Sequence, residues 1–98
     1  MVRRSKKVEY GSIAIRHIVA QRSEGIVTAK EIADRYGVPY ELLAKVLQKL
    51  ARAGLIVWTQ GMRGGYSLAR NPNEVSVSMI INAEEKFDTT KIPQMEFE

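Results

Sequence analysis

The 98-residue sequence contains no cysteine, a single histidine and no long hydrophobic run. The missing cysteines exclude disulfides, thiolate zinc sites and an iron–sulfur cluster held by cysteines of this chain, so we expect no cofactor. No apolar stretch approaches the roughly 20 residues that a membrane-spanning helix needs. The basic N-terminus has no apolar segment directly behind it and does not resemble a secretory signal. The composition fits a cytoplasmic protein.

The sequence also has little that catalysis would need. His17 is the only histidine, and without a neighbouring ligand pattern we expect it to be structural or at the surface. The pair Glu84 and Glu85 fits a solvated helix end better than an acid/base pair. Three further carboxylates lie on predicted helices without a partner base: Glu31, Asp34 and Glu41. We therefore expect that the protein is not an enzyme.

Positive charge is concentrated in the front part of the chain. Residues 1–70 carry 13 Lys and Arg against 5 Asp and Glu, whereas residues 71–98 carry 2 against 6. A basic front and an acidic tail indicate a polyanionic partner for the front. Scattered charge that only solvates the protein would give the same count, so the charge alone leaves both explanations open.

The first part of the sequence predicts a basic arm and two helices. Residues 1–8 are expected to form a flexible arm. A helix is predicted from about residue 9 to 22, and a shorter one over residues 29–36, with Thr28 as its N-cap and Glu31 completing a capping box. The apolar stripe of the longer helix consists of Ala14, Ile15, Ile18 and Val19, at helical spacing.

The next segment predicts the elbow of a helix-turn-helix. Gly37 can adopt a positive φ, which ends the short helix. Pro39 suits the first turn of the following helix, where a missing N–H costs nothing. That third helix is predicted over residues 40–53, and Gly54 ends it. Its apolar face consists of Leu42, Leu43, Val46, Leu47 and Leu50.

A β-hairpin and a last helix are predicted after the third helix. Strands over residues 55–59 and 66–70 flank a glycine-rich turn, so that Trp58 and Tyr66 face one another. A loop at residues 71–73 follows, and Ser76 can cap a helix over about residues 77–87. One side of this helix has Val77, Ile80, Ile81 and Glu84, and a second side has Met79, Ala83 and Phe87.

Residues 88–98 show no periodicity and are predicted to be a frayed tail. The predicted elements together describe one domain over residues 1–98, mainly α with a small β-hairpin, in a winged helix-turn-helix arrangement. This arrangement is suited to the major groove of DNA.

The polar face of the third helix supplies candidates for reading DNA. Glutamine can read adenine, lysine favours guanine and glutamate accepts from cytosine. The residues placed to reach base edges are Tyr40, Glu41, Lys45 and Gln48. Lys49 and Arg52 lie further along the helix and would meet phosphates, which position a protein without specifying a sequence.

The wing and the N-terminal arm supply further candidates. Arg63 at the wing tip could insert into a minor groove or pair with a phosphate. The basic residues of the arm suit phosphate contacts beside the groove: Arg3, Arg4, Lys6 and Lys7. Thr28, which opens the helix pair, completes the set of candidate DNA contacts.

Each of these features also has a simpler explanation. The polar face could be only the solvent side of an amphipathic helix, Arg63 an exposed arginine of an ordinary hairpin, and the arm a solvated tail. A nucleotide-binding P-loop needs Gly-Lys-Ser/Thr leading into a helix, whereas this glycine-rich loop lies between strands. A winged helix can also serve as a protein-interaction module, and this alternative stays open.

Four short motifs together resemble a known family. They are Glu31-Ile32-Ala33, Leu47-Gln48-Lys49-Leu50, Ala53-Gly54-Leu55 and Gly64-Gly65-Tyr66-Ser67-Leu68-Ala69. The sequence resembles the Rrf-two family of winged helix-turn-helix transcription regulators over about residues 5–87. This family includes the iron–sulfur cluster regulator, the nitric-oxide-sensing repressor and the cysteine-metabolism repressor.

The resemblance implies a bacterial, homodimeric transcription regulator that binds double-stranded DNA at a palindromic operator. It also implies that the third helix enters the major groove and that the wing contacts the minor groove. Carried over onto this sequence, the groove-reading role falls on Tyr40, Glu41, Ala44, Lys45 and Gln48, and the wing role on residues from Gln60 to Arg63.

The sequence departs from the family pattern in three respects. The iron–sulfur members have three cysteines after the fourth helix, whereas the matching residues 87–98 have none. Members usually continue with a long dimerisation helix, which this sequence does not include. We therefore expect a shortened member, or a dimer built from the first and fourth helices with Met79, Ala83 and Phe87. Gln60 also stands where an arginine is common, so Arg63 would have to substitute for it.

Overall fold

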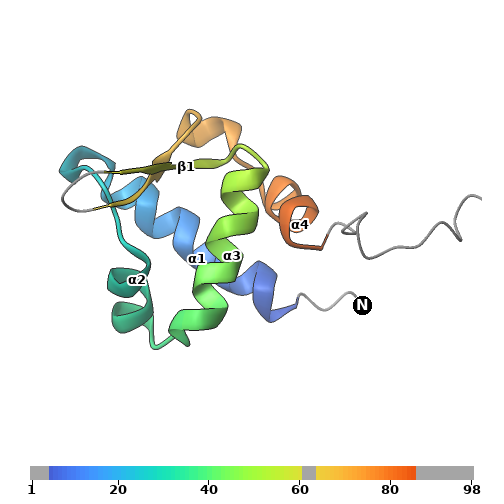
Figure 1. The fold of residues 1–98 in the computed structure, drawn as a ribbon. Helices are drawn as coiled ribbons and strands as arrows, with labels where there is room; N and C mark the ends of the chain where they lie inside the picture. The colour runs from blue at the N-terminus through green and yellow to red at the C-terminus, as the bar shows by residue number, and fades with distance from the viewer. Residues whose placement is uncertain (1–4, 61–63, 86–98) are drawn as a thin grey trace, which may run out of the picture.

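The computed structural model describes residues 5–60 and 64–85 of the chain. Figure 1 shows α3 crossing α1, with α2 and α4 on opposite sides of α3 and the hairpin across one end. In the described part of the chain, no helix is long and apolar enough to cross a bilayer. The elements are α1 (Lys6–Ala20), α2 (Ala29–Tyr36), α3 (Tyr40–Arg52), β1 (Ile56–Thr59), β2 (Gly65–Leu68) and α4 (Val77–Glu85), with 3-10 turns at Arg22–Glu24 and Pro72–Glu74.

Helix α1 begins three residues earlier than the sequence pattern predicted. The Ser5 hydroxyl accepts a hydrogen bond from the Val8 N–H at 3.3 Å and caps the helix, and Val8 is fully buried. The expectation of a flexible arm is therefore wrong for Lys6 and Lys7, which lie exposed in the first turn of α1. Residues 1–4 of the expected arm lie outside the described residues.

The elbow between α2 and α3 forms as predicted. The Thr28 hydroxyl accepts from the Glu31 N–H at 3.1 Å and caps α2. Gly37 ends α2 with φ of 68°, and its N–H donates to the Ala33 carbonyl. Pro39 immediately precedes α3 and occupies its N-cap position.

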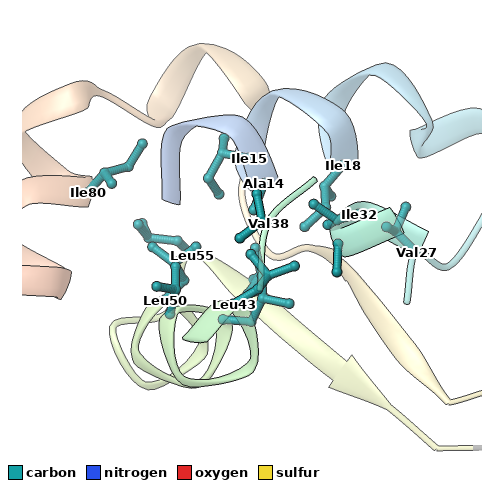
Figure 2. Packing of buried hydrophobic residues seen from close by; sticks show 14 of the residues in the cluster. Ala14, Ile15, Ile18, Val27, Ile32, Val38, Leu43, Leu50, Leu55 and Ile80 are labelled. Carbon is teal, nitrogen blue, oxygen red and sulfur yellow. The ribbon is translucent and has the colours of Figure 1, made fainter. Parts of the chain in front are cut away.

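The apolar core lies between the helices and the base of the hairpin (Figure 2). Helix α3 contributes four fully buried side chains, while Leu42, predicted on the same face, is only half-buried. Burial of several such side chains, at roughly 1.5–3 kcal/mol each, fixes α3 in place. The buried apolar residues are Val8, Ala14, Ile15, Ile18, Val27, Ile32, Ala33, Val38, Leu43, Val46, Leu47, Leu50, Leu55, Ile56 and Ile80.

The hairpin pairs β1 with β2 in antiparallel register, and Trp58 lies opposite Tyr66 as predicted. The structure adds a contact that the sequence pattern did not indicate. Val27, in the segment before α2, forms a β-bridge with Tyr66 through two backbone hydrogen bonds of 2.9 and 2.7 Å. The wing is thereby attached directly to the start of the helix-turn-helix.

Helix α4 begins as predicted, since the Ser76 hydroxyl accepts from the Met79 N–H at 3.3 Å. The predicted faces are only partly correct: Ile80 and Glu84 are buried, but Val77 and Ile81 are exposed. Met79 and Ala83, expected to be exposed for a dimer, are instead half-buried against the core. The expectation of a solvated helix end is wrong for Glu84, because α4 packs against both α1 and α3 and encloses this side chain. Residues 86–98, which include Phe87 and the predicted tail, lie outside the described residues.

Candidate nucleic-acid interface

Helix α3 has one face fixed in the core and one face open to solvent. Leu43, Val46, Leu47 and Leu50 anchor the inner face and are 1% exposed or less. An amphipathic helix held this firmly can present polar side chains in a fixed geometry. The outer face is the feature on which the candidate site depends.

The structure places the predicted base-reading residues together on this outer face. Tyr40, Glu41, Lys45 and Gln48 are exposed, and Ala44 between them is half-buried. Tyr40 has 54% of its surface exposed although it is aromatic. Arg52 continues the exposed face at the end of the helix. We call Tyr40, Glu41, Ala44, Lys45, Gln48 and Arg52 the α3 outer face.

Lys49 differs from the other candidates because it lies at the edge of α3 next to α4. It is half-buried, and its positive charge opposes the burial that raises the pKa of Glu84 on α4. Lys7 of α1 acts on Glu84 in the same direction. Lys49 and Lys7 therefore both lie near the buried carboxylate, and Lys49 is less open to a nucleic acid than Lys45.

The wing follows α3, and an aromatic pair joins its two strands. The rings of Trp58 and Tyr66 meet edge to face, with centroids 5.1 Å apart, and Trp58 is half exposed. Burial raises the pKa of Tyr66, and the nearby phenol of Tyr40 raises it further. The phenol side chains of Tyr40 and Tyr66 are therefore near enough to interact electrostatically. Gln60 is exposed just after β1, whereas Arg63 lies outside the described residues, as do Arg3 and Arg4.

Two glycines of the wing are needed for close packing. A Cβ on Gly64 would come within 2.5 Å of the Trp58 ring, and one on Gly65 within 2.8 Å of the Val27 carbonyl oxygen. Both distances are shorter than van der Waals contact. The motif Gly64-Gly65-Tyr66 therefore allows β2 to lie against both Trp58 and the segment that leads into α2.

Thr28 lies at the N-terminus of α2, directly after the wing contact of Val27, and is half-buried. The second half of the predicted capping box is absent from the described hydrogen bonds. The Glu31 carboxylate instead accepts from Nε2 of His17 at 2.8 Å. The expectation that Glu31 has no partner base is therefore wrong. His17 was expected to be either structural or at the surface, and it is structural.

The sequence pattern missed the contact of His17 with Glu31 because the two residues lie 14 positions apart on different helices. One available signal was the position of His17 beside Ile18, within the buried stripe of α1. Within residues 5–60 and 64–85, no group of three or more His, Asp or Glu side chains is arranged to hold a metal ion.

Comparison with known proteins identifies the family. The family model described as "Rrf2: Iron-dependent Transcriptional regulator" matches residues 4–95. The chain is 34% identical over 88 residues to the HTH-type transcriptional regulator IscR of Aliivibrio salmonicida, covering 89% of this chain and 52% of that protein. It is 36% identical over 80 residues to a putative HTH-type transcriptional regulator of Synechocystis, covering 82% and 54% respectively. The chain thus spans about half the length of these relatives.

Solved structures agree with this assignment. IscR of T. potens superposes with a TM-score of 0.79 at 35% identity, over 92% of this chain and 69% of that one. CymR, the global cysteine regulator of B. subtilis, superposes with a TM-score of 0.81 over 99% of this chain and 81% of its own. At 23% identity, CymR supports the fold alone. The mainly α, winged helix-turn-helix prediction is confirmed, and the chain belongs to the Rrf2 family of transcriptional regulators.

Proposed function

We propose that this chain is a sequence-specific regulator that binds double-stranded DNA in the cytoplasm. The α3 outer face enters the major groove, where its side chains meet base edges, and the wing lies at the adjacent minor groove. The observation that carries this proposal is the division of α3 into a fully buried inner face and an exposed polar outer face. An anchored helix with free donors and acceptors is what direct readout requires.

The roles of individual residues follow from their positions. Gln48 and Lys45 lie one turn apart on the outer face and are proposed to read bases, with Glu41 and Tyr40 beside them at the start of the helix. Ala44 leaves room between them for the edge of a base. Thr28, Lys6 and Lys7 are proposed to meet phosphates, with a smaller contribution from the half-buried Lys49. Gln60 is proposed to meet the minor groove. Arg63 is proposed to meet the minor groove or a phosphate, and Arg3 and Arg4 to meet phosphates. These three roles rest on the sequence alone.

We also propose that the protein binds as a homodimer at a palindromic site and without a cysteine-held iron–sulfur cluster. The chain has no cysteine to ligate such a cluster. Val77 and Ile81 of α4 are 42% and 36% exposed, which is high for aliphatic side chains and suits a second copy on that side.

The proposal is tested by selection from a random duplex library at two salt concentrations, followed by sequencing of the bound fraction. Enrichment of a palindrome with half-sites about one helical turn apart, or a multiple of this, supports a dimeric regulator. The variant Lys45→Ala with Gln48→Ala should then lose its preference for the enriched sequence while it keeps weak, salt-sensitive binding to any duplex.

A matched control changes an exposed ion pair outside the outer face. Lys30 and Asp34 pair at 2.7 Å along the surface of α2, so Lys30→Ala with Asp34→Ala should leave the preference intact. Equal loss on enriched and random duplexes in the Lys45 and Gln48 variant would contradict their base-reading role. No duplex binding at either salt concentration would favour a protein-interaction module instead.

A further inference from the structure

His17 connects α1 to both ends of α2. Its ring is 3% exposed, its Nε2 lies 2.8 Å from the carboxylate of Glu31 in the first turn of α2, and its Nδ1 lies 3.0 Å from the hydroxyl of Tyr36, the last residue of α2. The rings of His17 and Tyr36 also meet edge to face, with centroids 5.5 Å apart.

The hydrogen bonds satisfy every polar group of the buried ring. A carboxylate can only accept, so Nε2 carries the proton that is donated to Glu31, and in the neutral ring Nδ1 accepts from the Tyr36 O–H. A buried imidazole without these partners would lose the hydrogen bonds that water gives it. The ring therefore fixes the position of both partners, and through them the position of α2.

Helix α2 depends on interactions of this kind. It has eight residues, too few for an isolated helix to be stable in water. Its apolar anchors are Ile32 and Ala33, near the middle of the helix, which leaves both ends to be held by other groups. Among the described residues, the side-chain hydrogen bonds between α1 and α2 all come from His17.

We propose that His17 is a positioning residue for DNA binding, which holds α2 in the orientation that the bound state needs. This inference rests on the proposed function, in which Thr28 at the start of α2 meets a phosphate. In helix-turn-helix proteins the first helix of the pair crosses the phosphate backbone. The hydrogen bond from His17 also holds the Glu31 carboxylate against α1. Without this hydrogen bond, the Glu31 carboxylate could approach Thr28 and repel the phosphates bound there.

The expected effect is specific because α3 has its own anchors. Removal of the His17 hydrogen bonds allows α2 to leave its native orientation but leaves the buried inner face of α3 unchanged. Affinity should then fall equally for preferred and random duplexes, since the protein meets fewer phosphates but still reads the same bases. If only a tenth of the molecules keep α2 in the competent orientation, the dissociation constant rises about tenfold.

The test measures duplex affinity of four proteins at a temperature where circular dichroism shows each to be folded. His17→Leu removes both hydrogen bonds; its freed partners, Glu31 and Tyr36, are exposed and can bind water, so we expect it to fold. His17→Gln places an amide N–H where Nε2 donates to Glu31. Tyr36→Phe removes only the second bond. The fourth protein is the wild type.

We expect about tenfold weaker binding of His17→Leu to both duplexes. His17→Gln should recover most of the affinity, and Tyr36→Phe should be intermediate. The inference would be overturned if folded His17→Leu bound duplexes as tightly as the wild type. It would also be overturned if His17→Gln bound no more tightly than His17→Leu. A selective loss of sequence preference would also overturn it, because α3 would then be the affected helix. Absence of duplex binding by the wild type would instead refute the proposed function itself, and the inference with it.

Discussion

Gly11 of α1 lies directly against Glu84 of α4. A Cβ on Gly11 would stand 3.0 Å from Cγ2 of Ile80 and 3.6 Å from Cγ of Glu84, so the missing side chain makes room for Ile80, and Glu84 packs beside it. Glu84 is 1% exposed, and neither of its oxygens has a hydrogen-bond partner among the described residues. Burial raises its pKa to about 7; Lys49 and Lys7 oppose this rise, and Glu85 adds to it.

The first prediction concerns stability against pH. The folded protein binds a proton on Glu84 more tightly than the unfolded chain does, so this group's contribution is fully present below pH 4.5 and is lost as pH rises through about 7. The loss can reach about 3 kcal/mol by the conversion of pKa shift to free energy. Urea denaturation of wild type and Glu84→Gln from pH 5 to 8.5 should give a difference that grows with pH in favour of Glu84→Gln.

The exposed carboxylate of Glu74 provides the control for this measurement. Glu74→Gln should follow the wild-type profile, because an exposed side chain has similar surroundings in the folded and unfolded states. Parallel profiles for wild type and Glu84→Gln would show that Glu84 is solvated or paired in the folded protein.

How far the sequence predicts this structure depends on whether an interaction is local. The caps at Thr28 and Ser76 and the turn at Gly37 follow from residues within four positions of one another, and all were predicted. The register of Trp58 against Tyr66 follows from a short hairpin. In each case the chemistry of neighbouring residues determines the backbone geometry.

Interactions between distant segments were not predictable in this way. Glu84 is charged and close to the end of its helix, so its residue type favoured solvent although periodicity put it on the same side as Ile80. Its burial depends on the packing of α4 against α1 and α3, which lie far earlier in the chain. The pairing of His17 with Glu31 likewise requires the angle between α1 and α2. For the outer face of α3, periodicity indicated the exposed side, but it did not predict that Lys49 is half-buried next to Glu84.

The second prediction concerns the wing. Gly65→Ala should destabilise the fold by about 1–3 kcal/mol, the range expected for overpacking. The added Cβ would lie 2.8 Å from the carbonyl oxygen of Val27, a backbone atom that cannot move aside like a flexible side chain. Urea denaturation would measure the loss, and hydrogen exchange at the Val27 amide would show whether the bridge to Tyr66 opens. Ser67→Ala in the same strand is the control, and equal stability of the two variants would contradict this explanation.

The third prediction concerns the start of α2. Thr28→Ala removes the oxygen that accepts from the Glu31 N–H and should cost about 1 kcal/mol, the typical value for an N-cap. Thr28→Ser keeps the hydroxyl and should stay within a few tenths of a kcal/mol of wild type. Chemical denaturation compares the three proteins. Equal destabilisation by alanine and serine would assign the effect to the methyl group of Thr28 rather than to the cap.

The fourth prediction separates two lysines that lie one turn apart on α3. Lys45 is exposed on the outer face and is proposed to read bases, so Lys45→Ala should weaken binding to the preferred duplex more than binding to a random duplex. Lys49 favours the ionised form of Glu84, so Lys49→Ala should raise the pKa of that carboxyl and move the stability profile to higher pH. Binding titrations with the preferred and random duplexes and denaturation over pH measure the two effects. A greater loss of DNA affinity in Lys49→Ala than in Lys45→Ala, without a shift in its pH profile, would mean that Lys49 faces the nucleic acid and not the buried carboxylate.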